Sequence, residues 1–149
     1  FTAGFQGTRV LSYEIEAFSL NGIELAAAVD GLGYANYGNS ADVVSEWRTN
    51  TSLNYANGNH NLRYVYRFIQ GVEDERFDAG EAGREIDDFA THNLYYNYTL
   101  PWDENFIISL AIDNVTDEDP PFTQQQYSYD PFIGNALGRT YKIGLRKTF

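Results

Sequence analysis

The chain contains no cysteine and no methionine among its 149 residues, and basic side chains are few. Without cysteine it can form no disulfide, no thiolate-bound zinc site and no thiol nucleophile. The 21 acidic residues outnumber the 10 lysines and arginines, and the net charge of −11 argues against a nucleic-acid partner bound through its phosphates. No apolar run approaches the roughly 18 residues of a transmembrane helix, which argues against an α-helical membrane protein.

Aromatic residues make up 16% of the chain, and many of them recur with a period of two. At the carboxy terminus Tyr141, Ile143 and Leu145 alternate with Lys142 and Arg146. Such alternation predicts β-strands, and no stretch has a convincing helical period. We expect an all-β fold with about seven strands, over residues 9–19, 23–30, 46–56, 60–71, 92–100, 105–113 and 140–149.

Short and long connections alternate between these strands. Short, turn-like connections lie at Asn21-Gly22, Asn57-Gly58-Asn59 and 101–105, and long ones at 31–45, 72–88 and 114–138. Short periplasmic turns and long outer loops are typical of a transmembrane β-barrel, and strands of about 9–11 residues cross a bilayer when tilted. The sequence therefore predicts an antiparallel transmembrane β-barrel segment.

The long connections also hold most of the acidic charge. Eight acidic residues lie between 72 and 88, and five more lie between 113 and 138. Two interpretations stay open: a solvated acidic surface, or a surface that attracts divalent cations, for instance where it meets lipopolysaccharide.

No arrangement of residues predicts catalysis or a bound cofactor. His60 and His92 have no metal-ligand spacing, and we expect a structural role for His60, which lies beside a predicted turn. The segment 113–119 faintly resembles a calcium loop but lacks its central glycine and its trailing glutamate. Glu14 and Glu16 are expected to form the polar side of a strand rather than a catalytic pair. The chain is therefore predicted not to be an enzyme, with no cofactor and no metal.

The carboxy-terminal half resembles the end of a TonB-dependent receptor of the Gram-negative outer membrane. The resemblance is carried by Pro101-Trp102-Asp103, by the run from Ser109 to Phe122, by Tyr129-Asp130-Pro131 and by the final stretch from Leu137 to Phe149. It extends more weakly upstream, over residues 46–50 and 59–76, so that it covers about residues 20–149.

The resemblance implies that residues 1–149 are the carboxy-terminal part of a 22-stranded barrel. The plug domain and the TonB box would then lie upstream of Phe1, and the TonB complex would be contacted only through that missing part. The implied function is uptake of a scarce nutrient such as a siderophore, cobalamin or a sugar, and the implied location is the Gram-negative outer membrane. The partners would be outer-membrane lipid and lipopolysaccharide, the upstream barrel and plug, and the outer-membrane assembly machinery.

The resemblance also assigns an assembly signal to the last strand, namely Tyr141, Ile143, Leu145 and Phe149. Lys147 departs from that pattern, because the family often has an aromatic or apolar residue there. Alternation predicts that the opposite side chains face the barrel lumen, and these candidates are Arg48, Arg63, Arg67, Lys142 and Arg146, together with Glu14, Glu16 and Glu24. An aromatic girdle or lipid-facing surface is expected at Tyr13, Tyr55, Tyr64, Tyr66, Tyr96, Tyr98, Trp102 and Tyr141.

Two other interpretations remain open at the level of the sequence. One is a soluble β-sandwich that binds carbohydrate on exposed tyrosines. The other is a fragment that self-associates, because about seven strands leave two unpaired edges that can template an ordered β-assembly or fibre with a structural role.

Overall fold

The computed structural model describes residues 1–39 and 41–149; residue 40, in the connection expected at 31–45, lies outside the described residues. It has twelve β-strands: β1 (Thr2–Arg9), β2 (Glu14–Ile15), β3 (Phe18–Leu20), β4 (Ile23–Ala26), β5 (Val29–Asp30), β6 (Trp47–Asn57), β7 (His60–Ile69), β8 (Val72–Glu73), β9 (Glu85–Ile86), β10 (Phe89–Leu100), β11 (Asp103–Asp113) and β12 (Thr140–Lys147). The described residues contain no helix, and hence none long and apolar enough to span a membrane.

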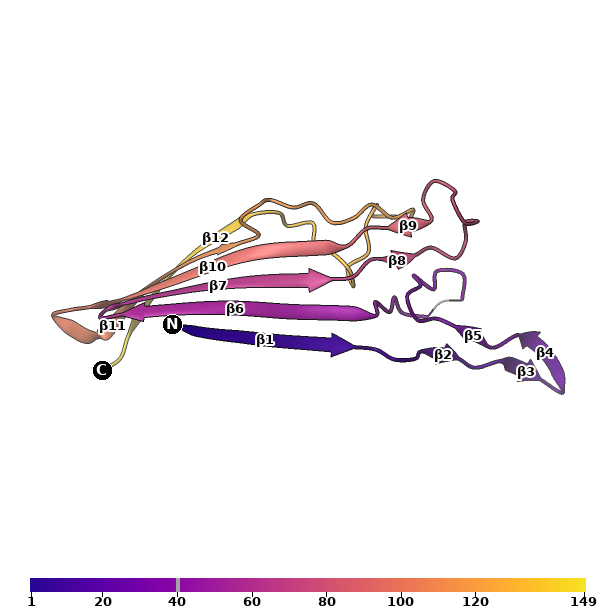
Figure 1. The fold of residues 1–149 in the computed structure, drawn as a ribbon, viewed down its shortest axis with the longest axis horizontal. Helices are drawn as coiled ribbons and strands as arrows, with labels where there is room; N and C mark the ends of the chain where they lie inside the picture. The colour runs from indigo at the N-terminus through magenta and orange to yellow at the C-terminus, as the bar shows by residue number, and fades with distance from the viewer. Residues whose placement is uncertain (40) are drawn as a thin grey trace.

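Six of these strands form one twisted sheet in the order β1-β6-β7-β10-β11-β12, and every neighbouring pair is antiparallel. Figure 1 shows the strands side by side along the long axis of the molecule. The sheet is open, because β1 and β12 pair on one side only. The expected all-β antiparallel fold is therefore confirmed, whereas a closed barrel is not formed by this chain.

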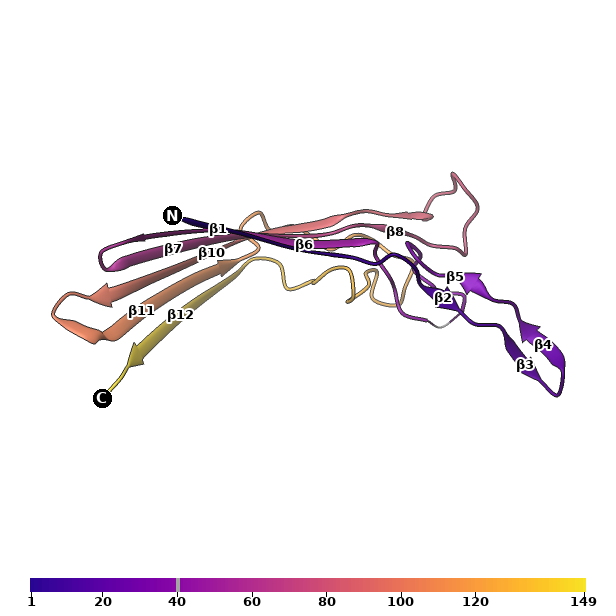
Figure 2. The ribbon, with the colours of Figure 1, turned by 60° about the horizontal axis from the view of Figure 1, so that its bottom comes forward.

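Connections of different length lie at opposite ends of the sheet. The turns after β6 and β10 are short and lie at one end, together with both chain termini, whereas the long connections gather at the other end (Figures 1 and 2). Gly58 makes the first turn possible, because its φ of 55° is in the left-handed region that side chains disfavour. We call these the turn end and the loop end.

The amino-terminal strands differ from the expectation. The predicted strands at 9–19 and 23–30 are not members of the large sheet, whose first strand is β1. Residues 14–30 instead form two small ribbons, β2–β5 and β3–β4, that project beyond the loop end (Figure 1). Asn21-Gly22 does form a turn, with φ of 53° and 80°, but at the tip of this projection rather than at the turn end.

Three consequences follow for residues assigned from the sequence. The large sheet has six strands rather than about seven. Tyr13 does not belong to its aromatic side, because it lies between the sheet and the ribbons. Glu14, Glu16 and Glu24 lie in or beside the ribbons and are not part of the large sheet that carries the arginines.

Strand register sorts the side chains of the large sheet onto two faces, because successive residues of a strand point to opposite sides. What we call the polar face consists of every second residue from Thr2 to Thr8, Arg48 to Asn54, Asn61 to Ile69, Phe89 to Asn97, Ile107 to Asp113 and Thr140 to Arg146. The apolar face consists of every second residue from Ala3 to Gly7, Thr49 to Tyr55, His60 to Phe68, Ala90 to Tyr98, Phe106 to Ile112 and Tyr141 to Leu145.

The long connections at the loop end pack against one another. Their apolar side chains form a small core with the start of β10, made of Ala35, Val43, Val72, Ile86, Phe89 and Ile133. These six residues come from four separate stretches of the chain, so the core ties the loops to the sheet. Most acidic side chains of these connections, for example Glu81, Asp87 and Asp88, stay exposed around this core.

Polar contacts reinforce this loop core. The side-chain amide of Asn36, itself buried, donates to the carbonyl oxygens of Gly31, Tyr34 and Asp42. The Tyr37 hydroxyl donates to Asp130 at 2.9 Å and so joins two long connections. Arg76 pairs with the fully buried Asp74, lies over the Tyr37 ring and donates to the carbonyl oxygen of Gln124.

Candidate functional site

The polar face carries all five basic residues that alternation had grouped together. Arg48, Arg63, Arg67, Lys142 and Arg146 come from three strands, and the register places each of them on this face. Asp113 is the only acidic residue of the face as defined above. The face therefore has an excess of positive charge although the whole chain has a net charge of −11.

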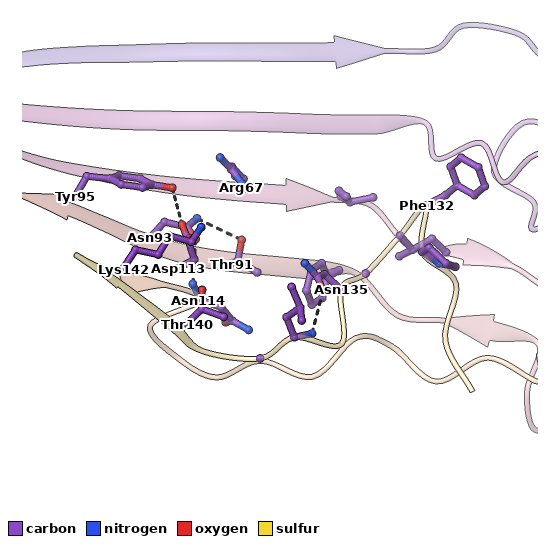
Figure 3. A pocket seen from close by; sticks show the side chains of 17 residues that line it. Arg67, Thr91, Asn93, Tyr95, Asp113, Asn114, Phe132, Asn135, Thr140 and Lys142 are labelled. Carbon is purple, nitrogen blue, oxygen red and sulfur yellow. Dashed lines mark hydrogen bonds and ion pairs between the residues drawn. The ribbon is translucent and has the colours of Figure 1, made fainter. Parts of the chain in front are cut away.

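Asp113 is the centre of a hydrogen-bonded group near the loop end. The Tyr95 hydroxyl donates to one of its carboxylate oxygens at 2.8 Å, and the Lys142 ammonium donates to the other at 2.5 Å (Figure 3). These partners come from β10 and β12, the two neighbours of β11. One of the five basic residues is thereby engaged with the one carboxylate of the face.

The four arginines of the polar face differ from Lys142. Within residues 1–39 and 41–149, the ion pairs of the structure involve Arg9, Arg76, Arg84, Arg139, Lys142 and Lys147, but none of these four arginines. Their guanidinium groups thus keep their full capacity to bind an anion.

A pocket of about 490 Å³ lies between the polar face and the connection that precedes β12. Arg67, Thr91, Tyr95 and Lys142 line it from the sheet, and the segment 131–138 lines it from the opposite side (Figure 3). The buried Asn93 supports this wall, because its amide donates to Val65 and accepts from the backbone N–H of Asn114.

A second, more open hollow of about 790 Å³ extends from this pocket along the polar face toward the turn end. Its lining is rich in amides and hydroxyls, including Gln6, Asn50, Ser52, Asn54, Asn61 and Asn97. Arg67 and Tyr95 line both hollows, so the two are neighbours on the polar face. Together they form a hydrogen-bonding surface that the segment 131–138 covers at the loop end.

The apolar face is uncovered as well. Leu53, Leu62, Ile143 and Leu145 are exposed, with Ile143 as much as 78% accessible. Within the bounds given above the face contains no Asp, Glu, Lys or Arg, and the charged residues that the register adds to it, Arg9 and Lys147, lie at the ends of β1 and β12. Six of the eight predicted girdle residues belong to it, namely Tyr55, Tyr64, Tyr66, Tyr96, Tyr98 and Tyr141, whereas Trp102 lies in the turn before β11.

Both histidines pair with tyrosines on the apolar face. His60 Nδ1 lies 2.6 Å from the Tyr96 hydroxyl, and His92 Nδ1 lies 2.6 Å from the Tyr64 hydroxyl. Each pair shares one hydrogen bond between neighbouring strands, which gives the polar tips of four aromatic residues a partner on an otherwise apolar surface. The structural role expected for His60 agrees with this geometry.

The residues assigned to an assembly signal are split between the last strand and its end. Tyr141, Ile143 and Leu145 project from the apolar face of β12. Phe149 follows the strand and is fully exposed. Lys147, which stands where the family often has an aromatic or apolar residue, forms an ion pair with Asp103 of the neighbouring strand, so that its charge is neutralised locally.

The described residues hold no group of three or more His, Asp or Glu side chains that could bind a metal ion. In the calcium-like segment, the Asn114 side chain is already bonded to the backbone N–H and carbonyl of Glu118. Asn114 and Asp117 adopt φ of 54° and 60°, as in tight turns. The acidic side chains here shape a loop.

Two titrating groups of the loop core are shifted from their ordinary pKa. Burial raises the pKa of Tyr37, and its hydrogen bond to Asp130 adds to the rise. Burial alone would also raise the pKa of Asp74, but hydrogen bonds from the side chain and backbone of Arg76 outweigh it and lower the pKa below its usual value.

No family model matches the chain, and no curated protein or solved structure matches it significantly.

Asn93 and Tyr95 are not among the site residues assigned from the sequence, and Asp113 is named there only within the calcium-like segment 113–119. Period-two alternation in 92–100 does place Asn93 and Tyr95 opposite Leu94, which is a usable signal. Nothing local indicates that the segment 131–138 folds over them, because that contact joins parts of the chain about 40 positions apart.

Proposed function

We propose that this chain is a wall segment of an outer-membrane β-barrel and that the barrel is a TonB-dependent receptor for a scarce nutrient. The observation that carries the proposal is the segregation of the sheet into two faces: an uncovered apolar face that has charged residues only at its ends, Arg9 and Lys147, and a polar face rich in arginine and amides. Lipid outside and water inside require that pattern of a barrel wall.

The dimensions of the apolar face support a membrane-spanning role. In β10 its members run from Ala90 to Tyr98, a distance of about 27 Å along the strand at roughly 3.4 Å per residue. A strand tilt of about 40° reduces that length to about 21 Å across the bilayer, close to the apolar band of about 25 Å that outer-membrane barrels present.

The competing soluble sandwich has less support. A sandwich buries one face of each sheet against another sheet. Among the described residues, the large sheet packs against no second sheet, and the three remaining sheets have two strands each. The tyrosines that would bind carbohydrate instead share one face with exposed leucines and isoleucines.

The specific identity as a receptor rests on the resemblance of the carboxy-terminal stretch. In that function the polar face lines the lumen and meets water or the plug, and the loop end faces the cell exterior. Upstream strands close the barrel, and the TonB complex acts through the upstream part. The last strand, with Phe149, directs insertion by the assembly machinery.

Cysteine labelling of intact cells tests the topology. A cysteine at Ala79, exposed in the long connection between β8 and β9, should react with a membrane-impermeant maleimide. A cysteine at Asn57, exposed at the turn end, should react only after the outer membrane is permeabilised. Labelling of Asn57→Cys in intact cells, or of neither site in permeabilised cells, would overturn the assignment.

A further inference from the structure

We infer that the pocket beneath the segment 131–138 binds an anionic group, a carboxylate or a phosphate, and that the guanidinium of Arg67 is its principal ligand. The inference that this group belongs to the transported solute rests on the receptor function proposed above. The site itself is defined by the polar face and the connection that roofs it.

Charge is the first argument. Within the pocket wall, Asp113 is the only acidic side chain, and Arg67 and Lys142 are the basic ones. Lys142 and the Tyr95 hydroxyl both donate to the Asp113 carboxylate, so its charge is already compensated. Arg67 makes no ion pair among the described residues, which leaves one uncompensated positive charge at this site.

The surroundings of Arg67 are the second argument. Its direct neighbours across the strands are Asn50 on β6 and Thr91 on β10, both neutral and polar. An anion beside the guanidinium would meet no carboxylate from these neighbouring positions. A planar guanidinium can donate two parallel hydrogen bonds to a carboxylate or a phosphate, which is the geometry that selects such groups.

The third argument is enclosure. A volume of about 490 Å³ falls within the range of small-molecule sites, which is roughly 300–1,000 Å³. Phe89, Ile133 and Leu137 supply apolar contacts around the polar wall. The other arginines of the face do not line this pocket: Arg146, for example, lines a smaller and more open hollow near Asn97 and Gly144.

The difference between Arg67 and Arg146 provides a matched control. Both are arginines of the polar face without an ion pair in the described part of the chain, and replacing either with glutamine removes one charge. Only Arg67 reaches the roofed pocket. A site at this pocket depends on Arg67, whereas a diffuse attraction to the basic face depends on both arginines equally.

The test is calorimetric titration of the full chain, refolded in detergent, with inorganic phosphate, with citrate and with glucose as a neutral probe. We expect phosphate or citrate to bind and glucose not to bind. Arg67→Gln should weaken anion binding at least about tenfold, as expected for losing a charge-assisted hydrogen bond, and Arg146→Gln should change it less than about twofold. Arg67→Lys should fall between the wild type and Arg67→Gln, because it keeps the charge but not the paired donors.

The phosphate and citrate titrations distinguish the two possible sources of the anion. If only phosphate binds, the pocket recognises a phosphate group, and if only citrate binds, it recognises a carboxylate. If both bind, the pocket recognises the anionic oxygens that the two groups share. Equal losses in Arg67→Gln and Arg146→Gln, equal binding of glucose, or no binding at all would overturn the site. Insertion into lipid vesicles is measured on the same preparation, so that a chain that inserts without binding anions refutes the pocket alone, and one that binds without inserting refutes the barrel.

Discussion

A charge placed on either side of β6 should distinguish the two faces directly. Leu53 and Ser52 are adjacent near the middle of this strand, and alternation directs them to the apolar and the polar face respectively. Leu53 is 52% exposed and packs against no second layer of this chain. Ser52 is next to Gly4 of β1, so that a longer side chain at this position has room to turn into the open hollow.

The two substitutions should lower the free energy of unfolding by measurably different amounts. An arginine on the lipid side of an outer-membrane barrel costs about 2–4 kcal/mol near the bilayer midplane. On the polar side the same arginine should cost less than about 1 kcal/mol, because its charge stays in water. Leu53→Arg should therefore lower the folding equilibrium constant at least about fivefold relative to Ser52→Arg.

The assay is urea titration of the chain in phospholipid vesicles, followed by tryptophan fluorescence at a fixed protein concentration. With a dependence of about 1–3 kcal/mol per molar urea, Leu53→Arg should shift the midpoint downward by about 1 M or more, and Ser52→Arg only slightly. The unmodified chain sets the reference. Equal shifts, or a larger shift for Ser52→Arg, would refute the assignment of lipid and lumen sides.

Three further predictions concern the loop core and the chain end. Asp74→Asn should destabilise the loops by about 2–3 kcal/mol, since it leaves Arg76 without its buried partner, and limited proteolysis should cut them faster. Because the folded-state pKa of Asp74 is lowered, its stabilisation is present above about pH 4 and is lost as pH falls through that lowered pKa, so the acid sensitivity of proteolysis should diminish in Asp74→Asn. The folded-state pKa of Tyr37 is raised, so the loops should lose protection as pH rises above about 10, and Tyr37→Phe, which cannot ionise, should not show that loss. Deleting Phe149 should reduce the amount of the parent receptor in the outer membrane on immunoblots; an unchanged amount would argue against the assembly signal.

Strands with strong alternation could be predicted from the sequence almost to the residue. The expected strand at 46–56 is observed as Trp47–Asn57, and the expected 105–113 as Asp103–Asp113. Both have a branched or aromatic residue at every second position over much of their length, and both adjoin a short turn. Where pairing is local and one face is apolar, period and turn chemistry are enough to fix the register.

The first strand was missed for a physical reason. Its apolar side consists of Ala3, Phe5 and Gly7, so two of the three positions give almost no hydrophobic signal. The stronger alternation of Leu11, Tyr13 and Ile15 lies in the stretch that leads to the projecting ribbons. β1 is held by its long-range pairing with β6, a partner that no local pattern specifies.

The candidate site was predictable in part. Alternation alone groups the five cations on one side, and the register agrees with that grouping. Alternation cannot show that Asp113 pairs with Lys142 and not with Arg67, because this pairing depends on the register between neighbouring strands. The position of residues 131–138 over the pocket cannot be predicted from the sequence, because this segment has no periodic pattern and is positioned by contacts of Ile133 with the loop core.

The two open edges limit what can complete the proposed barrel. β1 and β12 run in opposite directions, because five successive antiparallel pairings separate them. An antiparallel barrel closes only if the strands inserted between these edges are even in number. The 22 strands implied by the resemblance would leave about sixteen to be supplied upstream, which satisfies that condition. Because each unpaired edge amide or carbonyl costs several kcal/mol in hydrocarbon, the isolated chain in a bilayer should pair its edges with other copies, and cross-linking should then trap β1 against β12 of another copy. A chain that stays monomeric in vesicles with both edges free would contradict a membrane-spanning wall.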